Sequence, residues 1–134
     1  MALSNMVDLD AVRDGALVAA LIAVPAGVLA QVLDDEDATS NGWVSILALV
    51  VLLGLVIGAA VAAARQRTGT PLTHGILTAV GVFVVVQVIG ILRRTLADDG
   101  ITWSRIASSF LLSLMAGVVG GLIGSRANRI QASQ

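Results

Sequence analysis

Four long stretches of the chain contain no Asp, Glu, Lys or Arg, and all of the charged residues lie between or outside them. The stretches cover residues 15–33, 43–64, 72–92 and 106–124. A helix needs roughly 20 apolar residues to cross the hydrocarbon core of a bilayer. That core offers no water to backbone N–H and C=O groups, so each spanning segment must be helical. The sequence therefore predicts an all-α integral membrane four-helix bundle that forms one transmembrane domain over residues 1–134.

The composition excludes several classes of protein. Of the 134 residues, 57% are hydrophobic and only 13% are charged, whereas soluble domains are typically about 25% charged. A water-soluble fold of this size could not bury so much apolar surface, so the bilayer is the expected partner. The net charge of −1 gives no electrostatic support for a nucleic-acid partner. With no cysteine in the chain, disulfides and thiolate metal sites are excluded.

The two halves of the sequence resemble each other. A shift of 60 residues places Gly15 on Gly75 and Trp43 on Trp103. A further slip of three places Gly54 on Gly117 and Gly58 on Gly121; chance similarity between Ala- and Val-rich helices is the alternative explanation. The match predicts two tandem duplicated helical hairpins, at about 15–67 and 75–129, related by an axis along the membrane normal.

Small residues recur four positions apart in the second and fourth stretches. The sequences GLVIG, GVVGG and GGLIG contain this spacing, and its glycines are Gly54, Gly58, Gly117, Gly121 and Gly124. Glycine lets two helix backbones approach closely, and close packing replaces the missing hydrophobic driving force in lipid. We expect these glycines to pack helices together, either within one chain or between protomers.

Three polar side chains lie in or beside the spans. Gln87 is the deepest, and it could line a pore, bind a ligand or form an interhelical hydrogen bond worth about 1 kcal/mol. Gln31 lies near the end of the first span and is expected at the interface. His74 is the only histidine, so it could relay protons, sense pH or cap a helix at the membrane surface.

The arginines predict the orientation. Arg13 and four further arginines fall on one side of the membrane, and Arg93, Arg94 and Arg105 fall on the other. The arginine-rich side is usually cytoplasmic, so we expect both termini in the cytoplasm. The four further arginines form a basic patch that could hold lipid head groups or a partner: Arg65, Arg67, Arg126 and Arg129. Trp43 and Trp103 are expected to anchor the outer interface.

The middle of the chain carries a family resemblance. Residues 58–75 read GAAVAAARQRTGTPLTHG: a small-residue patch, a basic cluster, a short polar link and HG at the start of the next helix. This pattern resembles that of an uncharacterised family of small bacterial four-span membrane proteins, and PLTHG is similar to its actinobacterial branch. The resemblance implies the four-span fold and a location in the bacterial inner membrane, and it brings no activity with it.

Function is constrained mainly by what the sequence lacks. It contains no Ser/His/Asp set on a common helix face, no intramembrane carboxylate pair and no phosphate loop. We therefore expect a protein that is not an enzyme and has no cofactor and no bound metal. One hypothesis is an accessory or scaffold subunit that binds other membrane subunits or itself. The alternative is a homo-oligomeric channel or carrier for a small solute or ion, with Gln87 along the path.

Overall fold

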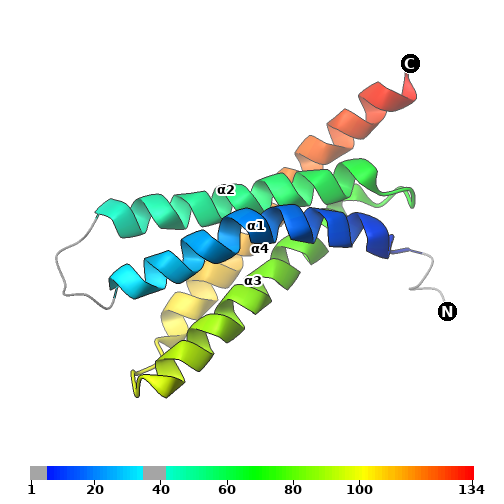
Figure 1. Ribbon diagram of the computed structural model, residues 1–134. Coiled ribbons are helices and arrows are strands. Elements are labelled where there is room, and N and C mark those ends of the chain that lie inside the picture. Colours follow the sequence, from blue (N-terminus) through cyan, green and yellow to red (C-terminus); the bar gives the residue numbers. More distant parts are fainter. Residues whose placement is uncertain (1–5, 35–41) are drawn as a thin grey trace.

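The computed structural model of the chain describes residues 6–34 and 42–134, and it contains four long helices (Figure 1). They are α1 (Leu9–Asp34), α2 (Gly42–Arg65), α3 (Pro71–Leu96) and α4 (Trp103–Ala132). Each helix is long and apolar enough to cross a membrane. The prediction of an all-α four-helix bundle is confirmed, and the chain is a small multi-pass membrane protein.

Each helix is longer than the apolar stretch from which it was predicted, because helix ends depend on caps rather than on hydropathy. The Oδ1 of Asp8 accepts a hydrogen bond from the N–H of Ala11 at 3.2 Å, so Asp8 caps α1 and the helix begins at Leu9. Pro71 opens α3, at a position where its missing N–H costs nothing. At its C-terminal end, α4 continues through polar residues to Ala132.

The helices run alternately up and down. The start of α1, the end of α4 and the turn between α2 and α3 lie at one end of the bundle, which we call the terminal end (Figure 1). The other end holds the C-terminal ends of α1 and α3 and the starts of α2 and α4, and we call it the hairpin end. Helix α2 contacts the three other helices, whereas α1 and α4 do not touch within the described residues.

Backbone-to-backbone packing of small residues joins α1 to α2. A Cβ atom placed on Gly58 would lie 2.5 Å from the carbonyl oxygen of Gly15. One placed on Gly15 would lie 2.6 Å from the Cβ of Ala62. Both distances are far shorter than any real carbon contact, so only glycine allows the two helices to cross this closely.

Helix α4 has two small-residue faces, one for each neighbour. Gly117 and Gly121 face α3, where a Cβ on Gly75 would lie 2.6 Å from the oxygen of Gly117. Gly120 and Gly124 face α2, where their added Cβ atoms would lie 2.6 and 2.7 Å from the Cβ atoms of Ala59 and Ala63. These glycines are therefore used inside the chain. Their contacts all lie in the terminal half of the bundle.

The contacts between helices show which residues of the two halves occupy equivalent places, and they match Gly58 with Gly117. Gly58 faces Gly15 and Ala19 of α1, and Gly117 faces Gly75 and Ala79 of α3. In this structure Gly117 thus occupies the place of Gly58, and the pairing of Gly54 with Gly117 does not hold. A glycine is required where the backbones cross, so the crossing point decides which residues correspond. The duplication of the hairpins stays a prediction.

Candidate functional site

The only histidine joins the start of α1 to the start of α3 at the terminal end. The N–H of Asp8 donates to Nε2 of His74 at 2.7 Å, and Nδ1 of His74 lies 2.7 Å from the carbonyl oxygen of Thr70. A carbonyl oxygen only accepts and a backbone N–H only donates, so the ring must be neutral with its proton on Nδ1. The side chain of His74 is fully buried. Both of its nitrogens are occupied, which makes His74 a structural connector here.

The turn between α2 and α3 is organised by Gln66, which is 5% exposed. Its Oε1 accepts hydrogen bonds from the N–H of Thr70 and the hydroxyl of Thr68, both at 3.2 Å. Its backbone oxygen lies 3.5 Å from Nδ2 of Asn128, on α4. The turn is therefore tied to itself and to the last helix.

Asp8 holds the same turn from the other side. Its Oδ1 caps α1, and its Oδ2 accepts a hydrogen bond from the N–H of Arg67 at 3.3 Å. Hydrogen bonds from the backbone N–H groups of Ala11 and Arg67 stabilise the charged carboxylate, and they lower the pKa of Asp8 below its ordinary value of 3.8, against an opposing effect of desolvation. This carboxylate therefore caps α1 and binds the turn between α2 and α3.

The four arginines of the predicted basic patch all lie at the terminal end and are exposed. Arg65 pairs with Asp14 of α1 through a 2.7 Å contact between Nη1 and Oδ2. The side chain of Arg65 is 63% exposed, and exposed pairs of this kind contribute about 0–1 kcal/mol. Arg67 follows α2, whereas Arg126 and Arg129 belong to the final turns of α4.

A cavity of about 580 Å³ opens in the hairpin half of the bundle, between α2, α3 and α4. It extends on α2 from Val44 to Leu55 and on α4 from Arg105 to Ser113, with Thr102 at the N-cap of α4. At 1.5 Å per residue, α2 lines it for about 16 Å, which is close to half of a 30 Å hydrocarbon core. The glycine contacts of the terminal half begin beyond Leu55 and Ser113, so they close the cavity at its inner end. Trp43 and Trp103, each 69% exposed, mark its outer end.

Gln31 is seated in this cavity by a glycine of α3. A Cβ on Gly90 would lie 2.7 and 2.8 Å from the amide nitrogen and oxygen of Gln31, so a side chain there would displace the amide from this position. The guanidinium of Arg93 donates to the backbone oxygen of Gln31 at 3.0 Å. The Oε1 atom of Gln31 is buried and has no hydrogen-bond partner among the described residues. A buried acceptor without a donor is costly, which makes this oxygen unusual.

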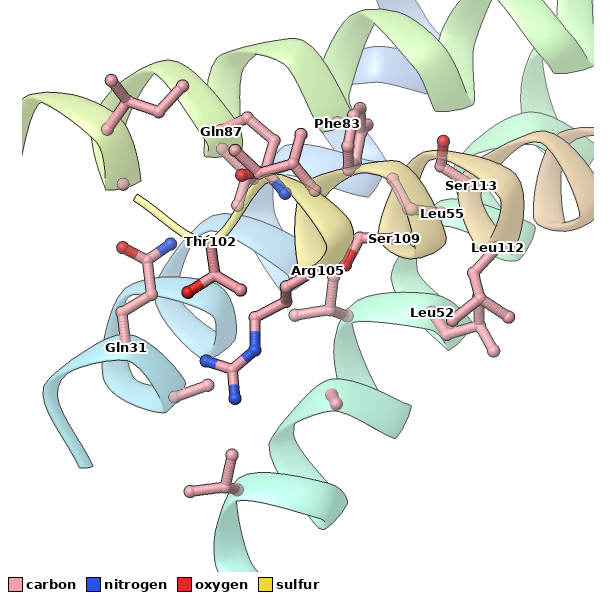
Figure 2. A pocket seen from close by; sticks show the side chains of 18 of the residues that line it. Gln31, Leu52, Leu55, Phe83, Gln87, Thr102, Arg105, Ser109, Leu112 and Ser113 are labelled. Atoms are coloured by element: carbon pink, nitrogen blue, oxygen red, sulfur yellow. The ribbon is translucent and has the colours of Figure 1, made fainter. Parts of the chain in front are cut away.

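Gln87 lines the same cavity from α3. Within the described part of the chain, no hydrogen bond from another helix reaches its amide. Figure 2 shows Gln87 beside Phe83, with its amide toward the cavity. Of the three roles open to Gln87, this placement favours contact with a ligand or with water over an interhelical bond.

A polar stripe along α4 was missed by the sequence analysis. It comprises four residues that line the cavity: Thr102, Arg105, Ser109 and Ser113. The spacing of four residues puts Arg105, Ser109 and Ser113 on one face of α4, with Thr102 at its N-cap, and this periodicity could have revealed them. Arg105 was considered only for orientation. Arg94 lines the cavity as well, and it donates to the oxygen of Gly100 at 3.4 Å.

The cavity changes from polar to apolar along its length. Gln31, Thr102 and Arg105 gather at one end, and Leu52, Leu55 and Leu112 lie at the other (Figure 2). Leu49 and Leu112 line the cavity although each keeps 55% of its surface exposed. Both lie well inside their spans, so the rim that they form opens toward the hydrocarbon of the bilayer.

The lining of the cavity provides hydrogen-bonding groups and apolar contact. Among residues 6–34 and 42–134, no three His, Asp or Glu side chains come together in a way that could hold a metal ion. His74 lies at the terminal end, far along α3 from Gln87.

Comparisons with known proteins give a family and no activity. A family model described as "Protein of unknown function (DUF3792)" matches residues 8–124. No curated protein and no solved structure matches the chain. The match covers most of the chain, including all of the cavity and the whole histidine connection.

Proposed function

Since this chain belongs to the DUF3792 family of proteins of unknown function, we propose a role from its own geometry: a non-enzymatic accessory or scaffold subunit of a bacterial membrane complex. The observation that carries the proposal is the end of α4. Its final turns extend past the other helices at the terminal end (Figure 1). They present Arg126 and Arg129, both exposed, and Ile130, which is 63% exposed.

The packing elsewhere supports this role. The small-residue faces of α1, α2 and α4 are filled by neighbours within the chain. The polar groups of the turn between α2 and α3 are largely paired internally. What remains for a partner is the aliphatic outer surface and the projecting end of α4, whose arginines can meet acidic groups of another subunit or of anionic lipids.

Gentle purification of the tagged protein from native membranes tests the proposal. We expect it to bring down one or more larger subunits in a fixed ratio. A variant that lacks residues 126–134 should lose those subunits and keep its helical content. The matched control is Arg67→Gln, which removes one exposed arginine at the same end and should retain them. Retention of the partners by the shortened chain would contradict the role of α4.

The cavity favours a second candidate, a homo-oligomeric channel or carrier, because it holds Gln87 at membrane depth. The glycine contacts close the inner end within one chain, so a path would have to form between protomers or by opening of the hairpins. Purification of the protein alone, as a defined oligomer, would favour this candidate. Solute flux into liposomes that falls in Gln87→Leu, and not in Val88→Leu, would then establish it.

We further propose that both termini lie in the cytoplasm, from the excess of arginine at the terminal end. Because the chain has no cysteine, a single Ser133→Cys variant can report the side. In intact cells we expect no reaction with a membrane-impermeant maleimide, and full reaction after the membrane is opened. Labelling of intact cells would reverse the orientation.

A further inference from the structure

We propose that the hairpin-end cavity binds an amphiphile with a hydroxyl-bearing polar head and an acyl chain, of the monoacylglycerol kind. This goes beyond an accessory role, and the cavity can hold such a ligand whatever partners the protein has. Its volume of about 580 Å³ falls within the usual range of roughly 300–1,000 Å³ for small-molecule sites.

The unpartnered amides define the head group. The buried Oε1 of Gln31 needs a donor, and the amide of Gln87 offers both a donor and an acceptor. Hydroxyl groups can donate to the first and accept from the second, and neither a methyl ester nor a bare hydrocarbon can supply the donor. Arg94 and Arg105 line the same region but have interactions of their own within the chain. Recognition therefore rests on the amides.

The position of Gln31 is built rather than accidental. Gly90 leaves the space that its amide fills, and Arg93 holds its backbone oxygen. Two residues of α3 thus position a residue of α1 at the polar end of the cavity. A site fixed by its supporting residues is what selective binding requires.

The apolar end defines the acyl chain. Leu52, Leu55 and Phe83 line the cavity beyond its polar end, and each buried methylene of a chain contributes about 0.8 kcal/mol. The half-exposed rim at Leu49 and Leu112 lies at hydrocarbon depth. A lipid could therefore enter from the bilayer and leave the rest of its chain there, which a free polyol in water could not do.

Binding should be measured on the full chain in an amine-oxide detergent, whose head group has no hydroxyl. Native mass spectrometry and titration calorimetry would then compare three probes: a monoacylglycerol, the fatty-acid methyl ester of the same chain length, and glycerol. We expect one saturable monoacylglycerol per chain. The methyl ester should bind at least about fivefold more weakly, because it supplies no hydroxyl donor, and glycerol should not bind.

Variants test the residues. Gln87→Leu should weaken monoacylglycerol binding about five- to tenfold, as expected for lost hydrogen bonds. Its matched control is Val88→Leu, at the next residue, which is 57% exposed on the lipid side and should bind normally. Ser109→Phe, which fills the cavity from α4, should abolish binding, and circular dichroism should show unchanged helix content in all three.

Two results would overturn the proposal. Equal affinity for the monoacylglycerol and the methyl ester would mean that the cavity recognises hydrocarbon alone. Equal affinity in Gln87→Leu and Val88→Leu would mean that the ligand binds elsewhere. Neither result depends on which subunits co-purify, so the proposed accessory role would be judged separately.

Discussion

The terminal end and the hairpin end of this bundle are made from the same four helices, but they are built in opposite ways. At the terminal end, glycines bring the backbones together, and Asp8, Gln66 and His74 are bound by hydrogen bonds within the chain. At the hairpin end the helices diverge around a cavity, and the amide oxygen of Gln31 has no partner among the described residues. Tight packing at one end of a bundle can thus create a binding site at the other, because helices that cross closely must separate further along.

The difference between the two ends predicts the largest loss of stability at Gly58, where α1 and α2 cross. Gly58→Ala would place a methyl group against Ala19 and 2.5 Å from the oxygen of Gly15, so the hairpin must separate at a cost of about 3 kcal/mol. Gly81→Ala is the matched control, since nothing lies within 4 Å of its added Cβ. Thermal unfolding in detergent measures both. An equally small change of stability in both variants would show that the glycines do not close the terminal end of the bundle.

A second, smaller effect is expected at the histidine. His74→Leu leaves the N–H of Asp8 without its acceptor, whereas the oxygen of Thr70 keeps the backbone N–H of residue 74, and the loss should cost about 1–3 kcal/mol. Hydrogen exchange should quicken at residues 8–12 and 66–70 and stay unchanged at the hairpin end. Thr73→Val, beside it on the exposed face, should behave like the unaltered chain.

The carboxylate of Asp8 should make the stability of the first turn of α1 depend on pH. Its pKa is lowered in the folded protein, chiefly by the N–H of Ala11, so its stabilising contribution is present above the ordinary value of 3.8 and is lost as the pH falls through the lowered one. Amide exchange in the first turn of α1 should therefore quicken only in strong acid. Asp8→Ala should show fast exchange at every pH, and Asp10→Ala should keep the transition.

The smallest change of stability is expected at Gly90, the glycine beside the cavity at the hairpin end. Gly90→Ala meets only the amide of Gln31, a movable side chain beside an open space, so we expect stability to change by well under about 1 kcal/mol. Monoacylglycerol binding should nevertheless weaken, since the amide is displaced. A loss of stability as large as that of Gly58→Ala would erase the difference between the ends.

Much of the fold could be predicted from sequence because the bilayer demands helices wherever charge is absent for long enough. The ends of the helices could not, since α1 begins where Asp8 provides a cap and α4 continues through polar residues. Gln87 was identified as a polar residue at depth, and Gln31 was expected at the interface. That they line one cavity depends on the angle at which helices cross, and hydropathy carries no information on that angle. The partner of His74 is a backbone N–H, a group that every residue except proline possesses.

The connection between Asp8 and His74 also bears on how the chain is assembled. The two residues are separated by 66 positions, and ribosomes add about 5–20 residues per second. Several seconds therefore pass between the synthesis of the two partners, during which the N–H of Asp8 lacks this acceptor. The histidine contact can form only after α1 and α2 have been made and α3 has begun, later than the contacts of α1 with Arg65 and Arg67. The contact is thus formed late in biogenesis, once the start of α3 packs beside the start of α1.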